Sequence, residues 1–236
     1  MGDRVGEGTR RVDLNADLGE EVTDDVALLA VITSANVACG YHAGTPAIMR
    51  AVCAEAVRLG VSVGAQVSYA DREGFGRRRT DVAMAVLREQ VADQVGTLAS
   101  IAASEGTEVR YVKPHGALYH RVIEDVEHAR AVLAGSGTLP LLGMPGVLLR
   151  LAVEAGRAVW HEGFPDRAYD DAGRLVPRHR PGAVLDDGER IAAQALTLAS
   201  RVDSLCVHGD EPDAVANARD VRRVLEAAGW TLEGLT

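Results

Sequence analysis

The fold is decided by the stretch VRYVKPHG, which runs from Val109 to Gly116. Its first residues are rich in β-branched and aromatic side chains, as expected of a buried strand, and it ends in lysine, proline, histidine and glycine. A segment typical of a helix, from Val122 to Ala134, comes next. The stretch therefore predicts one βα unit whose strand ends in polar side chains.

The same unit recurs along the chain, because short β-branched runs alternate with longer segments rich in Ala, Leu, Arg and Glu. The predicted strands are Arg11 to Asn15, Ala35 to Cys39, Val61 to Gln66, Val109 to Lys113, Pro140 to Gly143, Ala158 to Glu162 and Ser204 to His208, with an irregular eighth at Trp230 to Leu232. The predicted helices are Pro46 to Leu59, Val82 to Ser104, Val122 to Ala134, Gly146 to Glu154, Glu189 to Arg201 and Asp213 to Ala228. We therefore expect an α/β barrel in which residues 1–236 form one domain.

Composition and charge limit the function. The formal net charge of −9 argues against a general nucleic-acid-binding protein and favours small-molecule partners. We expect no membrane association, because the apolar runs are too short to span a bilayer and the polar start has no apolar segment. The three scattered cysteines suit reduced thiols, so we expect a cytoplasmic protein.

Polar side chains lie at the carboxyl end of nearly every predicted strand. In a parallel barrel these ends meet at one mouth, where catalytic groups gather. The side chains are Asp13, Asn15, Asp17, Cys39, His42, Gln66, Lys113, His115, His161, Glu162, His208 and Asp210. So many polar strand ends indicate an active site.

Structural explanations compete with this interpretation. Asp13, Asn15 and Asp17 alternate along an extended run and share one side of it, so they could also form a hydrogen-bonded network that satisfies the strand end. His42 could simply fix the glycine-rich loop around it, or it could help to bind an anion beside the helix that begins at Pro46.

Lys113 gives a sharper signal because it is the only lysine in the chain. A buried ammonium at a strand end needs a carboxylate or a substrate as its partner, and a salt bridge to Asp13 or Asp17 is the structural alternative. His115 could act as a general acid or base, or as a metal ligand. The segment Asp71 to Arg79 is either a solvated charged loop or a binding site for carboxylate or phosphate.

The segment Phe164 to Asp187 is rich in charge, proline and glycine. We expect it to lie outside the core as a surface loop over the active face. There it would act as a lid that places Asp166 and Arg167 near the site.

Six blocks of sequence together carry a resemblance that covers residues 11 to 228. They are VDLNADLGE (12–20), SANVACGYHAG (34–44), SYADREGFGRR (68–78), YVKPHGALYH (111–120), FPDRAYDDAGRLVPR (164–178) and CVHGDEPDAV (206–215). In this order they resemble the LamB/YcsF family, whose members are also called the A subunit of 5-oxoprolinase. The resemblance implies a seven-stranded TIM-like (β/α) barrel of the glycoside hydrolase/polysaccharide deacetylase type.

The resemblance also implies a function: hydrolysis of the lactam of 5-oxo-L-proline to L-glutamate, coupled to ATP hydrolysis, together with subunits B and C. ATP would be a co-substrate of the complex. The chain has no GxxxxGK[ST] phosphate-binding loop, so we expect the partner subunits to handle most of the ATP binding. The sequence departs from the family pattern at Gln66-Val67, where many members have His-Pro, and at Thr45 and Glu211, where Asp and Asn are common.

Roles follow from the chemistry of lactam opening. We expect Asp17 or His115 to be the base and Lys113 to stabilise negative charge. Arg77 or Arg78 would bind the substrate carboxylate. The further candidates for substrate binding are Asn15, His42, Glu162, Asp166, Arg167, His208 and Asp210.

Two alternatives stay open at this stage. A metal-dependent deacetylase or amidohydrolase would hold a divalent ion with Asp17, His42 and His115. A non-catalytic subunit would only bind lactams and pass them to its partners.

Overall fold

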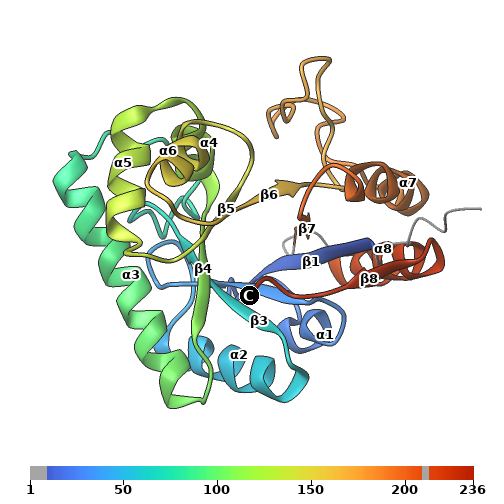
Figure 1. Cartoon of the computed structure of the whole chain (residues 1–236), viewed down its shortest axis with the longest axis horizontal. Coiled ribbons are helices and arrows are strands. Elements are labelled where there is room, and N and C mark those ends of the chain that lie inside the picture. The colour runs from blue at the N-terminus through green and yellow to red at the C-terminus, as the bar shows by residue number, and fades with distance from the viewer. Residues whose placement is uncertain (1–9, 209–212) are drawn as a thin grey trace, which may run out of the picture.

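The computed structural model describes residues 10–208 and 213–236, which alternate between strands and helices (Figure 1). The strands are β1 (Arg10–Leu18), β2 (Ser34–Ala38), β3 (Ser62–Val67), β4 (Val109–Pro114), β5 (Leu141–Gly143), β6 (Val159–Gly163), β7 (Ser204–Val207) and β8 (Trp230–Leu232). The helices are α1 (Asp25–Leu29), α2 (Pro46–Leu59), α3 (Met84–Ser104), α4 (Gly116–Glu124), α5 (Val126–Gly135), α6 (Val147–Glu154), α7 (Gly188–Ala199) and α8 (Ala214–Ala227).

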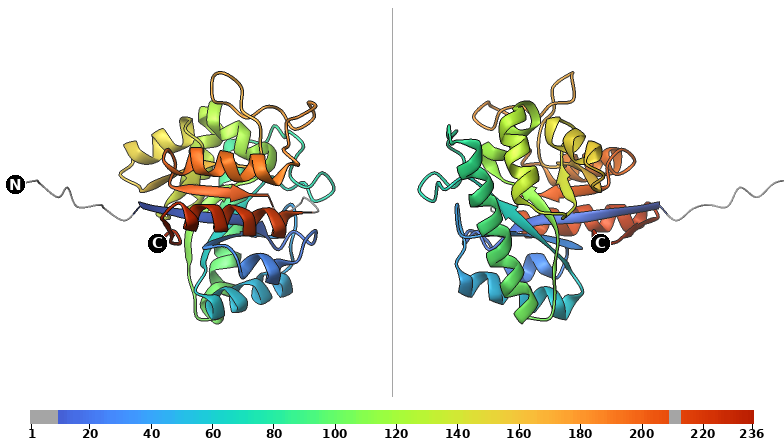
Figure 2. Two further views of the ribbon diagram at one scale, coloured as in Figure 1. Left: turned by 90° about the vertical axis from the view of Figure 1, so that its right-hand side faces the viewer. Right: turned by 60° about the vertical axis from the view of Figure 1, so that its left-hand side comes forward.

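Strands β1 to β7 form a closed parallel barrel in chain order, because β1 pairs with both β2 and β7. The expected seven-stranded α/β barrel is therefore confirmed. The eighth strand is present, but it pairs only with the first residues of β1 and stays outside the closed ring. Helices surround the barrel, and Figure 2 shows α7 and α8 lying along β7 and β1.

The sequence signals at the ends of α2 explain its bounds. Thr45 caps the helix by accepting a hydrogen bond from the backbone N–H of Ile48, and Pro46 occupies the first turn. Gly60 ends the helix with φ 70°, a left-handed conformation that glycine adopts without strain. Between these ends, buried Met49 and Val52 join the apolar layer between helices and barrel.

The alternation of side chains along β1 separates that apolar layer from the barrel interior. Leu14 and Leu18 belong to the main apolar core, whereas Asp13, Asn15 and Asp17 form hydrogen bonds with side chains of β2, β6 and β7. The mouth of this barrel is therefore lined by polar groups that the strands themselves position.

Three features differ from the expectations. The single helix expected at Val122 to Ala134 is two helices, which meet at Asp125, whose carboxylate caps α5 by accepting from the N–H groups of Glu127 and His128. The short helix α1 was not predicted. The segment from Phe164 to Asp187 contains no helix and stands out from the barrel as a loop (Figure 1), but the expectation that it lies outside the core is wrong for Asp166 and Arg167, which are buried.

Among the described residues, no helix is long and apolar enough to cross a bilayer.

Candidate active site

A cavity of about 540 Å³ opens at the carboxyl ends of the strands. Its walls come from β1, β4, α4, His208 just after β7, and two loops, the 71–79 segment and the segment from Phe164 to Asp187. The charged and titratable side chains that line it are Asp17, Arg77, Lys113, His115, Tyr119, His120, Arg167, Arg178, His179 and His208. Cations outnumber carboxylates here, which suits an anionic ligand despite the acidic chain.

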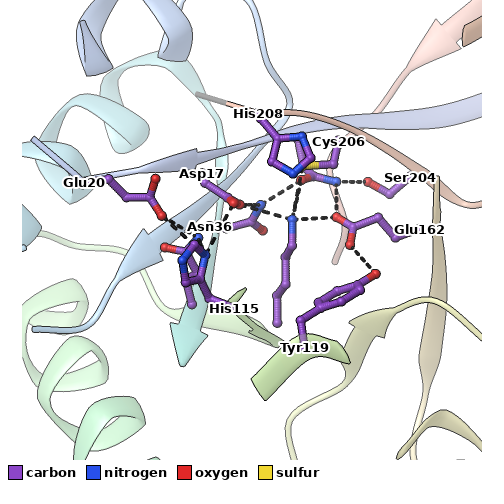
Figure 3. Close-up of polar contacts among 12 residues, drawn as sticks. Asp17, Glu20, Asn36, His115, Tyr119, Glu162, Ser204, Cys206 and His208 are labelled. Atoms are coloured by element: carbon purple, nitrogen blue, oxygen red, sulfur yellow. Dashed lines mark hydrogen bonds and ion pairs between the residues drawn. The ribbon is translucent and has the colours of Figure 1, made fainter. Parts of the chain in front are cut away.

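The ammonium of Lys113 is the centre of one group of buried side chains, which we call the Lys113 network. The network consists of Asp17, Lys113, Tyr119, Glu162 and Cys206. Lys113 Nζ lies 2.7 Å from Glu162 Oε1, 3.1 Å from Asp17 Oδ1 and 3.2 Å from Cys206 Sγ. The hydroxyl of Tyr119 donates to the other oxygen of Glu162 at 2.9 Å (Figure 3).

Amide and hydroxyl groups from the neighbouring strands hold the carboxylates in place. Asn36 donates to Asp17 Oδ1 at 2.9 Å (Figure 3). Asn15 donates to Glu162 Oε1 at 3.1 Å. The salt bridge that was the structural alternative for Lys113 is present with Asp17, whereas Asp13 accepts from the hydroxyls of Thr33 and Ser204.

Charges inside the Lys113 network fix its protonation. Burial alone would raise the pKa of Asp17, but the charge of Lys113 outweighs it and holds that pKa well below its ordinary value. Burial opposes the charged form of Lys113 as well, and the nearby Asp17 raises the pKa of the ammonium well above normal. Burial raises the pKa of Cys206 far above its usual value, so this side chain is a thiol. An ionised carboxylate and an ammonium therefore face the cavity together.

A second ion pair borders the same cavity. Nδ1 of His208 lies 2.8 Å from Asp166 Oδ2, and the backbone N–H of His208 donates to the same carboxylate. Burial would lower the pKa of His208, but the charge of Asp166 raises it. The ring of Phe164 stacks on His208 with centroids 5.3 Å apart. This arrangement suits a protonated histidine that is held in one orientation.

Four further residues at the mouth form what we call the His42 cluster: Glu20, His42, Gln66 and His115. Gln66 Nε2 lies 2.9 Å from both Glu20 Oε1 and His115 Nδ1. His42 Nε2 lies 3.4 Å from Glu20 Oε1 but has no hydrogen bond there, and its ring stacks on His115 at 4.2 Å. Only His115 also lines the cavity.

The backbone of the 71–79 loop supports this cluster. Phe75 has φ 55° although it is not a glycine, and its carbonyl lies 3.2 Å from His115 Nε2. Gly76 follows with φ 68°, and a Cβ there would lie 2.3 Å from Ser68 Oγ and 3.0 Å from His42 Cβ. The loop therefore depends on glycine to approach the two histidines closely.

Within the described residues, one set of side chains has the spacing of a metal site. The ligand atoms of Glu20, His42 and His115 all lie within 4.8 Å of one another. The sequence had suggested Asp17 instead of Glu20, but Asp17 is bound to Lys113 and its Oδ2 is 3.8 Å from His115 Nδ1.

The two candidate arginines point to different places. Arg77 lines the cavity and lies over the ring of Phe75 at 5.1 Å, whereas Arg78 pairs with Asp71 and Glu73 at the surface. Arg167 lines the cavity and also donates to the carbonyls of Val176 and Ala183, so it fastens the Phe164 to Asp187 loop. Asp210 lies outside the described residues.

Tyr119 and Glu20 were not among the predicted site residues. Tyr119 follows His115 by four positions in a helix, so a helical interpretation of KPHGALYH could have placed both on one face. Glu20 lies beyond the end of β1, and only the fold brings it against β3. No local pattern in the sequence indicates that contact.

Comparison with known proteins places the chain in a family. The model of the LamB/YcsF family matches residues 12–236. The chain belongs to the LamB/YcsF family. The expected family membership is therefore confirmed.

Relatives in this LamB/YcsF family are similar over nearly their whole length. The A subunit of 5-oxoprolinase from Streptomyces avermitilis is 50% identical over 242 residues, covering 92% of this chain and 97% of the relative. A 5-oxoprolinase A subunit from Agrobacterium fabrum is 46% identical, with coverages of 92% and 95%.

Solved structures agree with the barrel. The crystal structure of a lactam utilization protein from Thermus thermophilus superposes with a TM-score of 0.89 at 36% identity, covering 95% of this chain and 99% of the other. The catalytic domain of a peptidoglycan N-acetylglucosamine deacetylase from Eubacterium rectale superposes at 0.55 with 14% identity, covering 100% of this chain and 93% of that one. At that identity the second likeness shows the fold alone.

Proposed function

We propose that this chain is the ring-opening component of an ATP-dependent 5-oxoprolinase, which converts 5-oxo-L-proline to L-glutamate. The observation that carries the proposal is the cationic cavity, which presents an ammonium and an ionised carboxylate side by side at Lys113 and Asp17. The names of the relatives, which are a 5-oxoprolinase A subunit and a lactam utilization protein, support the same substrate class.

ATP supplies the activation that an unstrained lactam needs. Phosphorylation of the amide oxygen makes the amide carbon more electrophilic. The phosphoryl group that is added carries negative charge. Attack by water, followed by cleavage of the C–N bond, gives glutamyl phosphate, and a second water releases phosphate. Both the substrate and the intermediates are anions, which suits a cavity bordered by Lys113, Arg77, Arg167 and Arg178.

The side chains divide the proton transfers between them. Asp17 is ionised and lines the cavity, so it takes the proton from the attacking water. His208 has a raised pKa and uses Nδ1 for Asp166, so Nε2 delivers a proton to the ring nitrogen as it leaves. The ammonium of Lys113 stabilises the charge that develops on the phosphorylated oxygen. His115 remains a second candidate for the base because it borders the cavity beside Asp17.

Phosphoryl transfer belongs to the partners in this scheme. The sequence has no phosphate-binding loop of the GxxxxGK[ST] type, and we infer that subunits B and C bind ATP and activate the lactam in the cytosol. Closing the cavity by the Phe164 to Asp187 loop or by a partner would protect the activated lactam from bulk water.

Reconstitution with purified subunits B and C tests the proposal. We expect glutamate and ADP to form from 5-oxoproline and ATP in the mixture, and little or no glutamate with the chain alone. Arg77→Gln should raise the KM for 5-oxoproline, whereas the neighbouring Arg78→Gln should not, because Arg78 faces Asp71 and Glu73. Full activity of the isolated chain without ATP would contradict the division of labour and indicate a simple amide hydrolase.

A further inference from the structure

The His42 cluster contains buried polar atoms that the proposed ring opening does not use. Among the described residues, neither ring nitrogen of His42 has a hydrogen-bond partner, although the residue is only 1% exposed. Oε1 of Gln66 also lacks a hydrogen-bond partner in the part of the chain that the structure describes. Burying polar groups without partners is unfavourable, so this cluster has the character of a ligand site.

The carbonyl of Phe75 decides how His115 takes part. A carbonyl oxygen only accepts hydrogen bonds, so Nε2 of His115, which lies 3.2 Å from it, carries the proton. Nδ1 then presents its lone pair toward Glu20 Oε1, 3.5 Å away. Metal-binding histidines use the same arrangement, in which the second nitrogen donates to a backbone carbonyl or a carboxylate.

Glu20 Oε1 is the point on which the other groups converge. It lies 3.4 Å from His42 Nε2 and 2.9 Å from Gln66 Nε2. The same Gln66 nitrogen is 2.9 Å from His115 Nδ1, so the amide bridges two of the atoms that a cation would contact. Rotating this amide by half a turn would bring its unpartnered oxygen to the same position.

We propose that Glu20, His42 and His115 bind one divalent transition-metal ion, and that Gln66 rotates its amide to supply an oxygen as a fourth ligand. Two imidazoles with two oxygen donors suit Zn²⁺ and its first-row neighbours better than Ca²⁺ or Mg²⁺, which prefer oxygen ligands throughout. His115 is shared with the cavity wall, so the ion would lie directly beside Asp17 and polarise the region where the lactam binds.

Metal binding by the full chain tests this inference independently of activity. Protein stripped with a chelator is titrated with Zn²⁺ in competition with a chromophoric chelator, and the bound metal is counted by mass spectrometry. We expect one Zn²⁺ per chain, and a loss of affinity of at least about 100-fold in Glu20→Gln and His42→Asn. Gln66→Leu should weaken binding by about 10-fold and change the visible spectrum of the Co²⁺ form, because it removes only one oxygen ligand.

The control is His161→Asn, which removes a surface histidine that pairs with Asp203 and should keep full metal affinity. Circular dichroism of each variant separates loss of the ligand from loss of the fold. Absence of stoichiometric Zn²⁺ binding by the wild-type chain would overturn the site. An unchanged Co²⁺ spectrum in His42→Asn would also overturn it, since the ion would then lie elsewhere, for example among His120, His179 and His208 in the cavity. An unchanged spectrum and affinity in Gln66→Leu would remove Gln66 from the ligand set.

Discussion

The Lys113 network and the His42 cluster lie side by side at the mouth of one barrel, yet they differ in how their polar atoms are satisfied. In the Lys113 network each charge has a partner of opposite sign, since Lys113 Nζ contacts both Asp17 and Glu162. In the His42 cluster both nitrogens of His42 lack a hydrogen bond to any residue that the structure describes. Figure 3 shows Glu20 and His115 on one side of Asp17, and Tyr119, Glu162 and Cys206 on the other.

This difference separates two kinds of functional site. A group that is fully paired in the resting protein is preorganised, so it can stabilise charge without reorganisation when a substrate arrives. A buried group without partners costs stability until a ligand binds, so it marks a site whose ligand is part of its structure. We therefore expect mutations in the two regions to act on different quantities.

The largest effect is expected from replacing Lys113, which is the centre of the Lys113 network. Lys113→Met leaves the carboxylates of Asp17 and Glu162 buried without their cation, so it should abolish glutamate formation and lower the free energy of unfolding by about 3–5 kcal/mol. Chemical denaturation and the reconstituted assay measure the two losses. Because such a variant can fail to fold, the double variant Lys113→Met/Glu162→Gln serves as a control.

In that double variant one of the two unpaired charges is gone, so part of the stability should return while activity does not. Wild-type turnover by either folded variant would contradict the role of Lys113. Equal stability of the wild-type and Lys113→Met proteins would contradict the view that Lys113 stabilises the two buried carboxylates of the network.

Asp13 tests whether hydrogen bonds alone can satisfy a buried carboxylate. It accepts from Thr33 and Ser204 but pairs with no cation among the described residues, and burial raises its pKa to about 6. Because this folded-state pKa exceeds the unfolded value of 3.8, the native protein holds the proton longer, and stability falls as the pH rises from 3.8 to 6. The wild-type protein should therefore lose roughly 3 kcal/mol relative to Asp13→Asn between about pH 4 and pH 7. A constant difference across denaturation curves in this range would show that Asp13 keeps an ordinary pKa.

Breaking the ion pair of His208 and Asp166 should have a smaller effect, which is on the reaction rate and its pH dependence. Asp166→Asn removes the charge that raises the pKa of His208, so this pKa should fall, and the pH above which activity declines should fall with it. The rate at neutral pH should drop by about 10²-fold. A pH–rate profile of the complex measures both changes, and Asp203→Asn, which alters the exposed pair with His161, is the matched control. A profile identical to that of the wild type would remove His208 from the proton transfers.

Three members of each region were predicted from the sequence: Asp17, Lys113 and Glu162 in the Lys113 network, and His42, Gln66 and His115 in the His42 cluster. Asp17, Lys113 and Glu162 each end a strand, and the rule that parallel strand ends meet at one mouth is enough to bring them together. Glu20 lies beyond its strand, and its contact with Gln66 joins β1 to a strand that is not its neighbour. That contact reaches past β2, which pairs with both strands, and no local pattern in the sequence contains it.

Two further differences have equally local causes. Arg77 and Arg78 are adjacent in the sequence, and the left-handed backbone at Phe75 and Gly76 accompanies the turn that sends only Arg77 to the cavity. The apolar periodicity through Val122 to Ala134 predicted one helix, but the cap made by Asp125 divides it. Hydrophobic periodicity is read over many residues, so it does not reveal a helix cap or a backbone turn that depends on a single residue.

The smallest expected effect, and the most direct test of the comparison, is replacement of a side chain that has no hydrogen bond to lose. His42→Leu has a similar volume and removes two buried ring nitrogens that have no hydrogen bond among the described residues, so the free energy of unfolding of metal-free protein should change by less than about 1 kcal/mol. Saturating Zn²⁺ should then stabilise the wild-type chain by about 3 kcal/mol at a hundredfold excess over Kd and leave His42→Leu unchanged. Thermal unfolding with and without Zn²⁺ measures both differences. If His42→Leu were as destabilising as Lys113→Met in metal-free protein, the side chain of His42 would stabilise the fold as much as that of Lys113. The distinction between the two regions would then be wrong.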